Sequence, residues 1–260
     1  MSTEATKEVL HRLMQPAKGR AREQERAEAR ALQESLLPQT APQVPGYDIA
    51  LAWQGSPEVS GDYFDVFPLR PNQTALCIAD VSGKGLAAAK LASELQGAVR
   101  GFAPDATSPA ELCTQVNQAL CRPGGEPRLI TMFYGVLDPA EKKLHYENAG
   151  HCLPLLVRAD NAVEFPASFS GVVGIFSHWL YQNQEAELRP GDCLLLVTDG
   201  LLQAEGRRRQ EFGYQRLIAA VQKGRTRSAQ ELAQEIIAEV GHHTGGKWRD
   251  DASLIVVKVD

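Results

Sequence analysis

Nine short runs of β-branched, aromatic and aliphatic residues follow one another between residue 47 and the end of the 260-residue chain. The runs are YDIALAWQ (47–54), YFDVFPL (63–69), TALCIADV (74–81), RLITMFYGVLD (128–138), KKLHYENAG (142–150), PLLVR (154–158), YQNQEAEL (181–188), CLLLVTD (193–199) and SLIVVKV (253–259). Most are bounded by Gly, Pro, Asn or Asp, as strands usually are. Helical segments lie between and after groups of strands, so the order predicts an α+β fold with two packed, largely antiparallel sheets and helices outside.

Three helices are predicted among these strands. The first covers residues 86–102. The second begins at Ser108, where an N-cap serine, a proline in the first turn and Glu111 at the third helical position have the pattern of a capping box. The third begins at Ser228, which also has a glutamate three residues later.

Residues 1–37 differ in composition from the rest of the chain. Two helical stretches, 4–14 and 18–37, lie on either side of Pro16, and the second is rich in Ala, Glu, Arg and Gln. The proline-rich sequence LPQTAPQVPG then ends the helix. We therefore divide the chain into an N-terminal helical segment, a linker or dimerisation element of residues 1–37, and a main domain of residues 38–260.

One narrow apolar stripe runs along the second of these N-terminal helices. Ala29, Leu32 and Leu36 follow helical spacing and share one face. Because such a stripe is too thin to stabilise an isolated helix, the helix is predicted to pair with a copy of itself or to dock on the main domain. A frayed polar leader is the alternative interpretation.

Charge and hydropathy narrow the class of protein. The 27 Lys and Arg residues against 32 Asp and Glu give a net charge of −5, which argues against general nucleic-acid binding. No stretch approaches the roughly 20 apolar residues of a membrane span, and the N-terminus lacks the basic-then-apolar order of a secretory signal. A cytoplasmic protein is therefore expected. The five cysteines include no CxxC pair, which favours free thiols over disulfides or zinc ligands.

Aspartates stand where predicted buried strands end or begin. Asp80 closes ALCIAD, Asp199 closes CLLLVTD, and Asp250 with Asp251 precedes the last strand. Asp62 lies in VSGDYFDVF, between a glycine and a strand. Glycine accompanies several of them, and it permits the tight backbone that brings a turn close to a ligand. Each aspartate taken alone also fits an ordinary turn residue, so only the set indicates a site.

A convergence of these carboxylates would require cations, because two like charges about 4 Å apart repel by roughly 4 kcal/mol at an effective dielectric constant of 20. Oxygen ligands without His or Cys favour Mg²⁺ or Mn²⁺, and several carboxylates can hold two such ions about 3.5 to 4 Å apart. A water bridging two ions loses a proton readily and becomes a nucleophile. Hydrolysis of a phosphate ester most needs this arrangement, since it is among the slowest uncatalysed reactions.

Seven stretches between residue 36 and the C-terminus carry a more specific signal: VSGDYFDVF, IADVSGKGLAAA, TMFYGVLDP, LHYENAGH, LRPGDCLLLVTDGL, FGYQRL and DDASLIVVKV. In this order they resemble the SpoIIE/RsbU-like branch of the PPM family, the metal-dependent protein serine/threonine phosphatases. The resemblance implies an α-β-β-α sandwich with a two-metal site between the sheets and a metal-activated bridging water as nucleophile.

The same resemblance implies a ligand set. The GD motif places Asp62 among the metal ligands, the ADVSGKG motif places Asp80, and the TDG motif places Asp199. In the DDAS motif the first aspartate aligns with the family's ligand, so Asp250 is expected and Asp251 is the alternative.

Two positions depart from the family pattern. Val81 stands where the family has a glycine whose backbone carbonyl is a ligand, and a carbonyl does not depend on the side chain. Ser60 replaces the first glycine of the usual VGGD, which affects local backbone geometry more than the ligands. The N-terminal arginine that binds phosphate in eukaryotic-type members has no match.

Three weaker signals lie near these motifs. His151 stands where eukaryotic-type members carry an aspartate that helps to bind a third metal; it would act as a ligand or proton donor, or as a structural histidine that fixes the Asn148 loop. Lys84, at the start of a helix, would face a substrate phosphate or solvent. Residues 207–209 are three consecutive arginines, ordinarily a solvated loop, where an acidic partner could dock.

The resemblance implies a phosphoprotein phosphatase that uses two Mn²⁺ or Mg²⁺ ions to hydrolyse phosphoserine or phosphothreonine. Its implied substrate is a small phosphorylated anti-sigma-factor antagonist (STAS-type) protein of a bacterial partner-switching system. Since no sensor domain is recognised, control is expected from a separate regulatory protein or from homodimerisation through the N-terminal helix. Two alternatives stay open: a non-catalytic phosphoprotein-binding module (pseudophosphatase), whose usual mark is a missing metal aspartate, and a small-phosphate hydrolase, for which no GxxxxGK[ST] loop is present.

Overall fold

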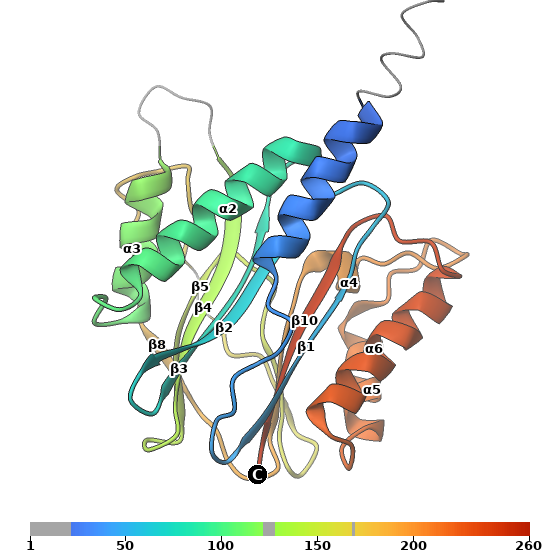
Figure 1. The fold of residues 1–260 in the computed structure, drawn as a ribbon. Helices are drawn as coiled ribbons and strands as arrows, with labels where there is room; N and C mark the ends of the chain where they lie inside the picture. Colours follow the sequence, from blue (N-terminus) through green and yellow to red (C-terminus); the bar gives the residue numbers. More distant parts are fainter. Residues whose placement is uncertain (1–21, 122–127, 168–169) are drawn as a thin grey trace, which may run out of the picture.

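Two five-stranded sheets pack face to face in the computed structural model, which describes residues 22–121, 128–167 and 170–260 (Figure 1). The first sheet consists of β1 (Tyr47–Gln54), β10 (Ala252–Val259), β9 (Cys193–Val197), β6 (Leu155–Val157) and β7 (Val163–Glu164), in that order. The second consists of β2 (Tyr63–Arg70), β3 (Gln73–Val81), β4 (Ile130–Asp138), β5 (Lys143–Ala149) and β8 (Gln184–Glu187). Neighbouring strands are antiparallel throughout. All nine expected strands are present; β7, two residues long, was too short to leave a pattern.

Helices cover the outer face of each sheet. The helices on the second sheet are α2 (Gly85–Phe102) and α3 (Pro109–Leu120). Those on the first sheet are α4 (Asp199–Leu202), α5 (Gly213–Lys223) and α6 (Ala229–Thr244). The predicted α-β-β-α sandwich is therefore confirmed (Figure 1). Helix α5 was not predicted, because its N-cap position is a phenylalanine without a capping hydrogen bond. No helix within the described ranges combines the length and the apolar character needed to cross a membrane.

Side-chain alternation along the strands separates three apolar layers. Along β3, Leu76 and Ile78 point into the layer between the sheets, whereas Ala75, Cys77 and Ala79 pack beneath α2 and α3. A third cluster joins the first sheet to α5 and α6. All five cysteines are free, as their spacing predicted.

The two predicted capping boxes differ in the structure. At α6 the box is complete, since Ser228 and the glutamate three residues later bond each other's backbone N–H. At α3 the Ser108 hydroxyl accepts the Glu111 N–H at 3.3 Å, but the Glu111 carboxylate accepts from the N–H and hydroxyl of Thr107. The expected box at Ser108 is thus only half formed, because Thr107 offers Glu111 two donors instead of one.

The N-terminal helix, residues 22–36, packs on the main domain beside α2 (Figure 1). Ala29 is fully buried against Val59 and Ala89, with Leu32 packed alongside. The apolar stripe thus contacts this chain's own domain, which is one of the two predicted alternatives. The other predicted stretch, 4–14, lies outside the described residues.

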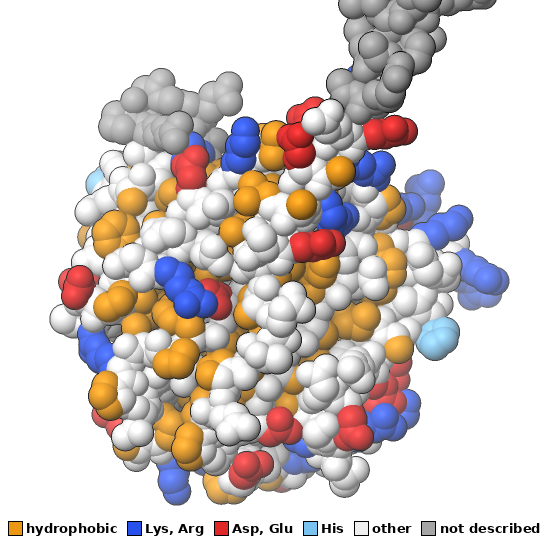
Figure 2. Space-filling model, viewed as in Figure 1, with side chains coloured by type: hydrophobic (Ala, Val, Ile, Leu, Met, Phe, Trp, Pro, Cys, Tyr) orange, Lys and Arg blue, Asp and Glu red, His pale blue; other side chains and the backbone are white. Residues whose placement is uncertain are grey.

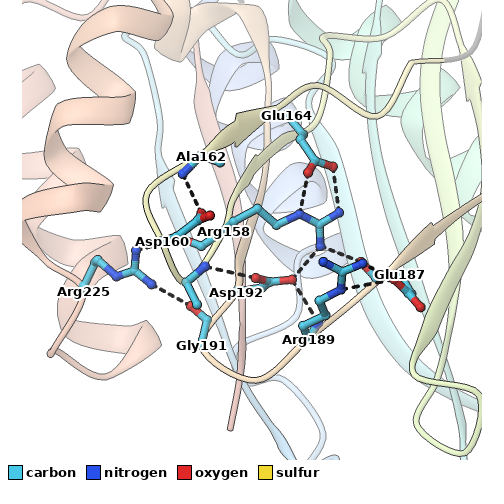
Figure 3. Close-up of polar contacts among 10 residues, drawn as sticks. Arg158, Asp160, Ala162, Glu164, Glu187, Arg189, Gly191, Asp192 and Arg225 are labelled. Carbon is cyan, nitrogen blue, oxygen red and sulfur yellow. Dashed lines mark hydrogen bonds and ion pairs between the residues drawn. The ribbon is translucent and has the colours of Figure 1, made fainter.

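A network of charged residues fixes one end of the first sheet (Figure 3). The Arg158 guanidinium binds both carboxylate oxygens of Glu164 at 2.7 Å and one oxygen of the buried Asp192 at 2.7 Å. Arg225, after α5, donates to the backbone carbonyls of Arg158 and Gly191. The network therefore joins the β6–β7 turn, the start of β9 and the loop after α5 at the end of the sandwich away from the aspartates.

Candidate metal centre

Four strand ends meet at the other end of the sandwich, in the layer between the sheets. In the second sheet β2 begins and β3 ends there, and in the first sheet β9 ends and β10 begins there. Asp62 directly precedes β2, Asp80 is the penultimate residue of β3, Asp199 follows β9, and Asp250 lies just before β10. The alternation along β3 directs Asp80 toward the facing sheet. The antiparallel order thus gathers all four predicted aspartates at one edge of the fold.

Asp62 is the most deeply buried of these carboxylates, with 3% of the residue exposed. Its Oδ2 accepts hydrogen bonds from the hydroxyls of Thr198, at 2.8 Å, and Ser253, at 2.7 Å. Both donors come from the opposite sheet, so these bonds tie the two sheets together. Burial, followed by the charge of Asp80, raises the pKa of Asp62 well above its usual value despite the two hydrogen bonds.

The charge of Asp250 acts on both Asp80 and Asp199. Burial, and then the charges of Asp199 and Asp250, raises the pKa of Asp80 to about 7, while Lys84 acts in the opposite direction. Burial and the charge of Asp250 also raise the pKa of Asp199. The shifts have one cause: several carboxylates occupy a partly desolvated space with little positive charge to balance them.

Asp250 and Asp251 differ in their surroundings, although they are adjacent in the sequence. Asp251 is 1% exposed, and its oxygens accept the Ser56 N–H at 2.6 Å and the side-chain amide of Gln33. The Asp250 side chain is 45% exposed and interacts electrostatically with Asp199. Asp251 therefore supports the backbone around the cluster, whereas Asp250 stays partly exposed, with Oδ1 accepting the Asp251 N–H and Oδ2 lying 3.8 Å from Lys84 Nζ.

Two glycines let the backbone approach the cluster closely. A Cβ at Gly61 would overlap the carbonyl oxygen of Val81, and a Cβ at Gly200 would overlap the carbonyl oxygen of Asp251. A side chain at either position would displace the strand end that carries an aspartate. The Val81 carbonyl remains open on this side only because residue 61 is glycine.

The donor set fits hard divalent cations. Within the described ranges, no three His, Cys, Asp or Glu side chains already surround one point as in a closed metal site. The carboxylates instead repel one another, and among the described residues only Lys84 offsets this charge, through its effect on Asp80. An all-oxygen set of like charges spread over a wider space suits ions bound side by side with water completing their shells.

His151 has the contacts of a structural residue. It is 8% exposed, its N–H donates to Oδ1 of Asn148 at 2.7 Å, and the Asn148 amide donates back to its carbonyl at 3.2 Å. Its Nδ1 lies 2.9 Å from the Thr131 hydroxyl, and burial lowers its pKa to about 4. The imidazole is therefore neutral at pH 7 and brings no positive charge to the site.

Lys84 lies across the mouth of the cluster. Its Nζ is 3.8 Å from Oδ2 of Asp250 and donates to the carbonyl of Arg249 at 3.3 Å. With 42% of its side chain exposed, it can turn toward an incoming anion. The contact with Asp250 places it nearer the acidic cluster than a freely solvated lysine would be.

Sequence reasoning did not assign four side chains that the structure places around the cluster. Thr198 and Ser253 donate hydrogen bonds to Asp62. Both residues lie within the motifs quoted above, so the motifs could have indicated that these hydroxyls belong to the site. Cys152 lies beside the aspartates, where burial and their charges raise its pKa to about 12. Gln33 reaches the site from the N-terminal helix, and nothing in its local sequence distinguishes it from the other glutamines there.

The different surroundings of the paired aspartates lead to a first prediction. Asp250→Asn should lower the affinity for Mn²⁺ at least about 10-fold, with little effect on metal-free stability, because among the described residues its side chain accepts its neighbour's N–H and forms a long, exposed ion pair with Lys84. Asp251→Asn should lower the metal-free unfolding free energy by about 1 to 3 kcal/mol, since an amide has one acceptor oxygen instead of two. Calorimetric titration with Mn²⁺ and urea unfolding in EDTA measure the two effects; the reverse pattern would make Asp251 the ligand.

The sequence is similar to a known protein family and to several characterised proteins. A family model described as Stage II sporulation protein E (SpoIIE) matches residues 70–260. Protein IcfG of Synechocystis sp. is 26% identical over 259 residues, covering 88% of this chain and 40% of IcfG. The phosphoserine phosphatase RsbU of Bacillus subtilis is 26% identical over 231 residues, covering 87% of this chain and 68% of RsbU.

Two solved structures have the same architecture. The RsbU and RsbW domains of Rv1364c from Mycobacterium tuberculosis match with a TM-score of 0.72 at 26% identity, over 86% of this chain and 62% of that one. The SiaA-PP2C domain of Pseudomonas aeruginosa matches with a TM-score of 0.80 at 20% identity, over 94% and 99% of the two chains. At 20% identity the second likeness shows the fold alone.

Proposed function

The chain belongs to the SpoIIE family, and from this we propose that it is a protein phosphatase that removes phosphate from serine or threonine. The observation that carries the proposal is the set of four aspartates gathered between the sheets, where burial and then the neighbouring aspartates raise the pKa of three of them. The similarity to the phosphoserine phosphatase RsbU supports the same reaction class. A protein that only binds phosphoproteins would have no use for a complete acidic set.

We propose that two Mn²⁺ or Mg²⁺ ions occupy the site. The groups that would hold them are the side chains of Asp62, Asp80, Asp199 and Asp250 and the backbone carbonyl of Val81. When bound, such ions supply Lewis acidity toward the phosphoryl oxygens and lower the pKa of an attacking water. The donor chemistry supports this choice, because carboxylate and carbonyl oxygens favour hard cations.

The surrounding residues would hold this arrangement in place. Thr198 and Ser253 fix the orientation of Asp62, and two hydroxyl donors keep one oxygen occupied while the other remains available. His151 would position the Asn148 loop at the end of β5, a structural role that its neutral, buried ring supports. Lys84 would meet the negative charge of a phosphoserine as it enters, since its ammonium already lies at the mouth of the cluster.

The physiological substrate is proposed to be a phosphorylated STAS-type anti-sigma-factor antagonist. The similarity to RsbU, and to a mycobacterial chain that joins RsbU and RsbW domains, supports a place in partner-switching signalling. The chain spans 40% of IcfG and 62% of that mycobacterial chain, so the partners of the longer proteins enter here only as proposals.

Residues 1–37 are proposed to carry regulatory input to the phosphatase domain. Gln33, on the N-terminal helix, bonds Asp251, which adjoins the proposed ligand Asp250. A regulatory protein that moved this helix would therefore move the segment before β10. The alternative of a homodimer would have to use residues outside the apolar stripe, since Ala29 is fully buried and Leu36 is 8% exposed.

The proposal is tested by comparing substrates and metals. We expect hydrolysis of a phosphoserine protein or peptide in Mn²⁺ or Mg²⁺, loss of activity in EDTA, and recovery when the metal is restored. Binding of the phosphopeptide without turnover in either metal would support the pseudophosphatase instead. Faster turnover of free nucleotides than of phosphoserine peptides would support a small-phosphate hydrolase.

A further inference from the structure

A group of exposed cations borders the acidic cluster on one side. The group, called the basic rim below, consists of Arg207, Arg208, Arg209, Lys247 and Arg249. Lys and Arg side chains gather at the right-hand edge of the molecule in Figure 2, where the loop after α4 and the loop before β10 lie in Figure 1. Because the chain as a whole has a net charge of −5, this local concentration of positive charge indicates a surface that attracts negatively charged groups.

A small pocket joins the basic rim to the proposed metal site. Its lining includes the acidic residues Asp199, Glu205 and Asp250 together with Lys247, Trp248 and Arg249. Its volume is about 190 Å³, below the roughly 300 to 1,000 Å³ of typical small-molecule sites. The pocket therefore has room for a phosphorylated side chain, and the rest of a substrate must lie on the surface around it.

The three arginines are presented on a well-defined hairpin turn. Glu205 and Glu211 form an isolated antiparallel bridge, and Gly206 N–H donates to the Gln210 carbonyl at 2.9 Å. Arg209 N–H donates back to the Gly206 carbonyl at 2.9 Å, and Arg209 has a φ of +56°. Glycine or asparagine would adopt this left-handed conformation more readily than arginine, so the turn geometry does not explain the choice of residue.

Most of the rim's charge is not used within the molecule. Arg249 forms an ion pair with Glu205, which also ties the hairpin to the segment before β10. Within the described residues no hydrogen bond or ion pair is formed by the side chains of Arg207, Arg208, Arg209 and Lys247. The exposed Glu211 is the other acidic residue on the hairpin. At least three positive charges therefore remain available to a partner.

We propose that the basic rim docks acidic residues that surround the phosphoserine of a protein substrate. The inference rests on the proposed phosphatase function, and it adds a specificity determinant outside the metal site. Complementary charge next to a shallow site speeds productive encounter and selects among substrates that share the same phosphoserine. The substrate class that fits is a phosphoprotein with Asp or Glu on the face that carries the phosphorylated residue.

A protein partner fits the rim better than a nucleic acid does. The rim is a compact patch beside the site, and the chain's net negative charge opposes the long-range attraction that nucleic-acid binding relies on. Lys247 and Arg249 of the rim also line the pocket beside the proposed metal site, so a protein held by the rim would have its phosphorylated residue close to that site.

The test compares two phosphoserine peptides, one with Glu on both sides of the phosphoserine and one with Gln at the same positions. In Mn²⁺ at low salt, the acidic peptide should have a kcat/KM about 5- to 30-fold higher, as expected for a few partly exposed charge pairs. Triple replacement Arg207→Ala, Arg208→Ala and Arg209→Ala should bring the ratio close to one. Arg209→Gly, which suits the turn, should lower the ratio without loss of thermal stability.

A matched control removes the same charge at the other end of the sandwich. Lys143, Arg189 and Lys223 each form an exposed ion pair there, and replacing all three by Ala should leave the peptide ratio unchanged. If the control variant lowered the kcat/KM ratio of the two peptides as much as the triple arginine variant does, the effect would come from net charge, and the proposed role of the basic rim would be wrong. A ratio near one in the wild type would also overturn it.

A binding measurement separates this inference from the proposed function. Fluorescence anisotropy of the labelled, unphosphorylated acidic peptide in Mg²⁺ should show weaker binding to the triple arginine variant than to the wild type or the control. This result would stand even if the protein hydrolysed none of the phosphopeptides. Equal binding to all three proteins, or rim-dependent binding of single-stranded DNA in place of the peptide, would overturn the proposal.

Discussion

Replacing Asp199 by Asn should lower kcat/KM for p-nitrophenyl phosphate in Mn²⁺ at least about 100-fold, an effect larger than that of losing a residue around the ligands. Asp199 follows β9 at the point where the first sheet meets the second, and Asp250 and Asp80 lie within electrostatic range. An amide keeps the shape but loses the negative charge and one strong oxygen donor. The measurement is steady-state hydrolysis over a Mn²⁺ titration, so that weaker metal binding is distinguished from slower turnover.

Asp105→Asn is the matched control for this substitution. Asp105 is exposed in the turn between α2 and α3, away from the strand ends that carry the cluster. Its replacement should leave activity within about twofold of the wild type, as is usual for surface changes. Activity of Asp199→Asn equal to that of Asp105→Asn at every Mn²⁺ concentration would refute the proposed metal centre.

The sandwich was predictable because its signals are local. Alternating apolar runs bounded by turn residues mark a strand whatever it packs against, and the box at Ser228 is complete within four residues. The predicted capping box at Ser108 is only half formed for an equally local reason, since the Glu111 carboxylate accepts hydrogen bonds from the N–H and the hydroxyl of Thr107 instead of from the Ser108 N–H. Helix α5 lacks a polar cap, so its start at Gly213 has no local mark.

The site was only partly predictable, because some of its contacts are not local. The four aspartates stand at strand ends; antiparallel pairing gathers such ends within each sheet, and the packing of the two sheets brings the two pairs together. The choice between Asp250 and Asp251 depends on Gln33, which contacts Asp251 across 218 positions of sequence. The alternation of side chains along β10 explains part of the difference between the two aspartates. Ser253 faces Asp62 between the sheets, and Asp251, two residues earlier, lies on the same buried side.

The acidic cluster should also reverse the usual pH dependence of stability in the metal-free protein. Burial and neighbouring aspartates raise the pKa of Asp80 to about 7 from its usual 3.8, and the pKa values of Asp62 and Asp199 are raised as well. Between pH 4 and 7 the folded chain therefore keeps protons that the unfolded chain has lost. Its unfolding free energy should fall as the pH rises through this window, by up to about 4 kcal/mol for Asp80 alone.

Metal binding should oppose this loss, because ions bind the deprotonated carboxylates of the folded chain. At a Mn²⁺ concentration about 100 times Kd, each site adds about 2.7 kcal/mol, and the gain should grow as the pH rises. Urea unfolding followed by circular dichroism from pH 5 to 8, in EDTA and in Mn²⁺, measures both effects. Asp80→Asn serves as the internal control, since removing the carboxylate should flatten the EDTA curve. The same slope in wild type and variant would mean that burial and the neighbouring aspartates do not raise the pKa of Asp80 in the folded chain, and a main reason to place cations beside it would be lost.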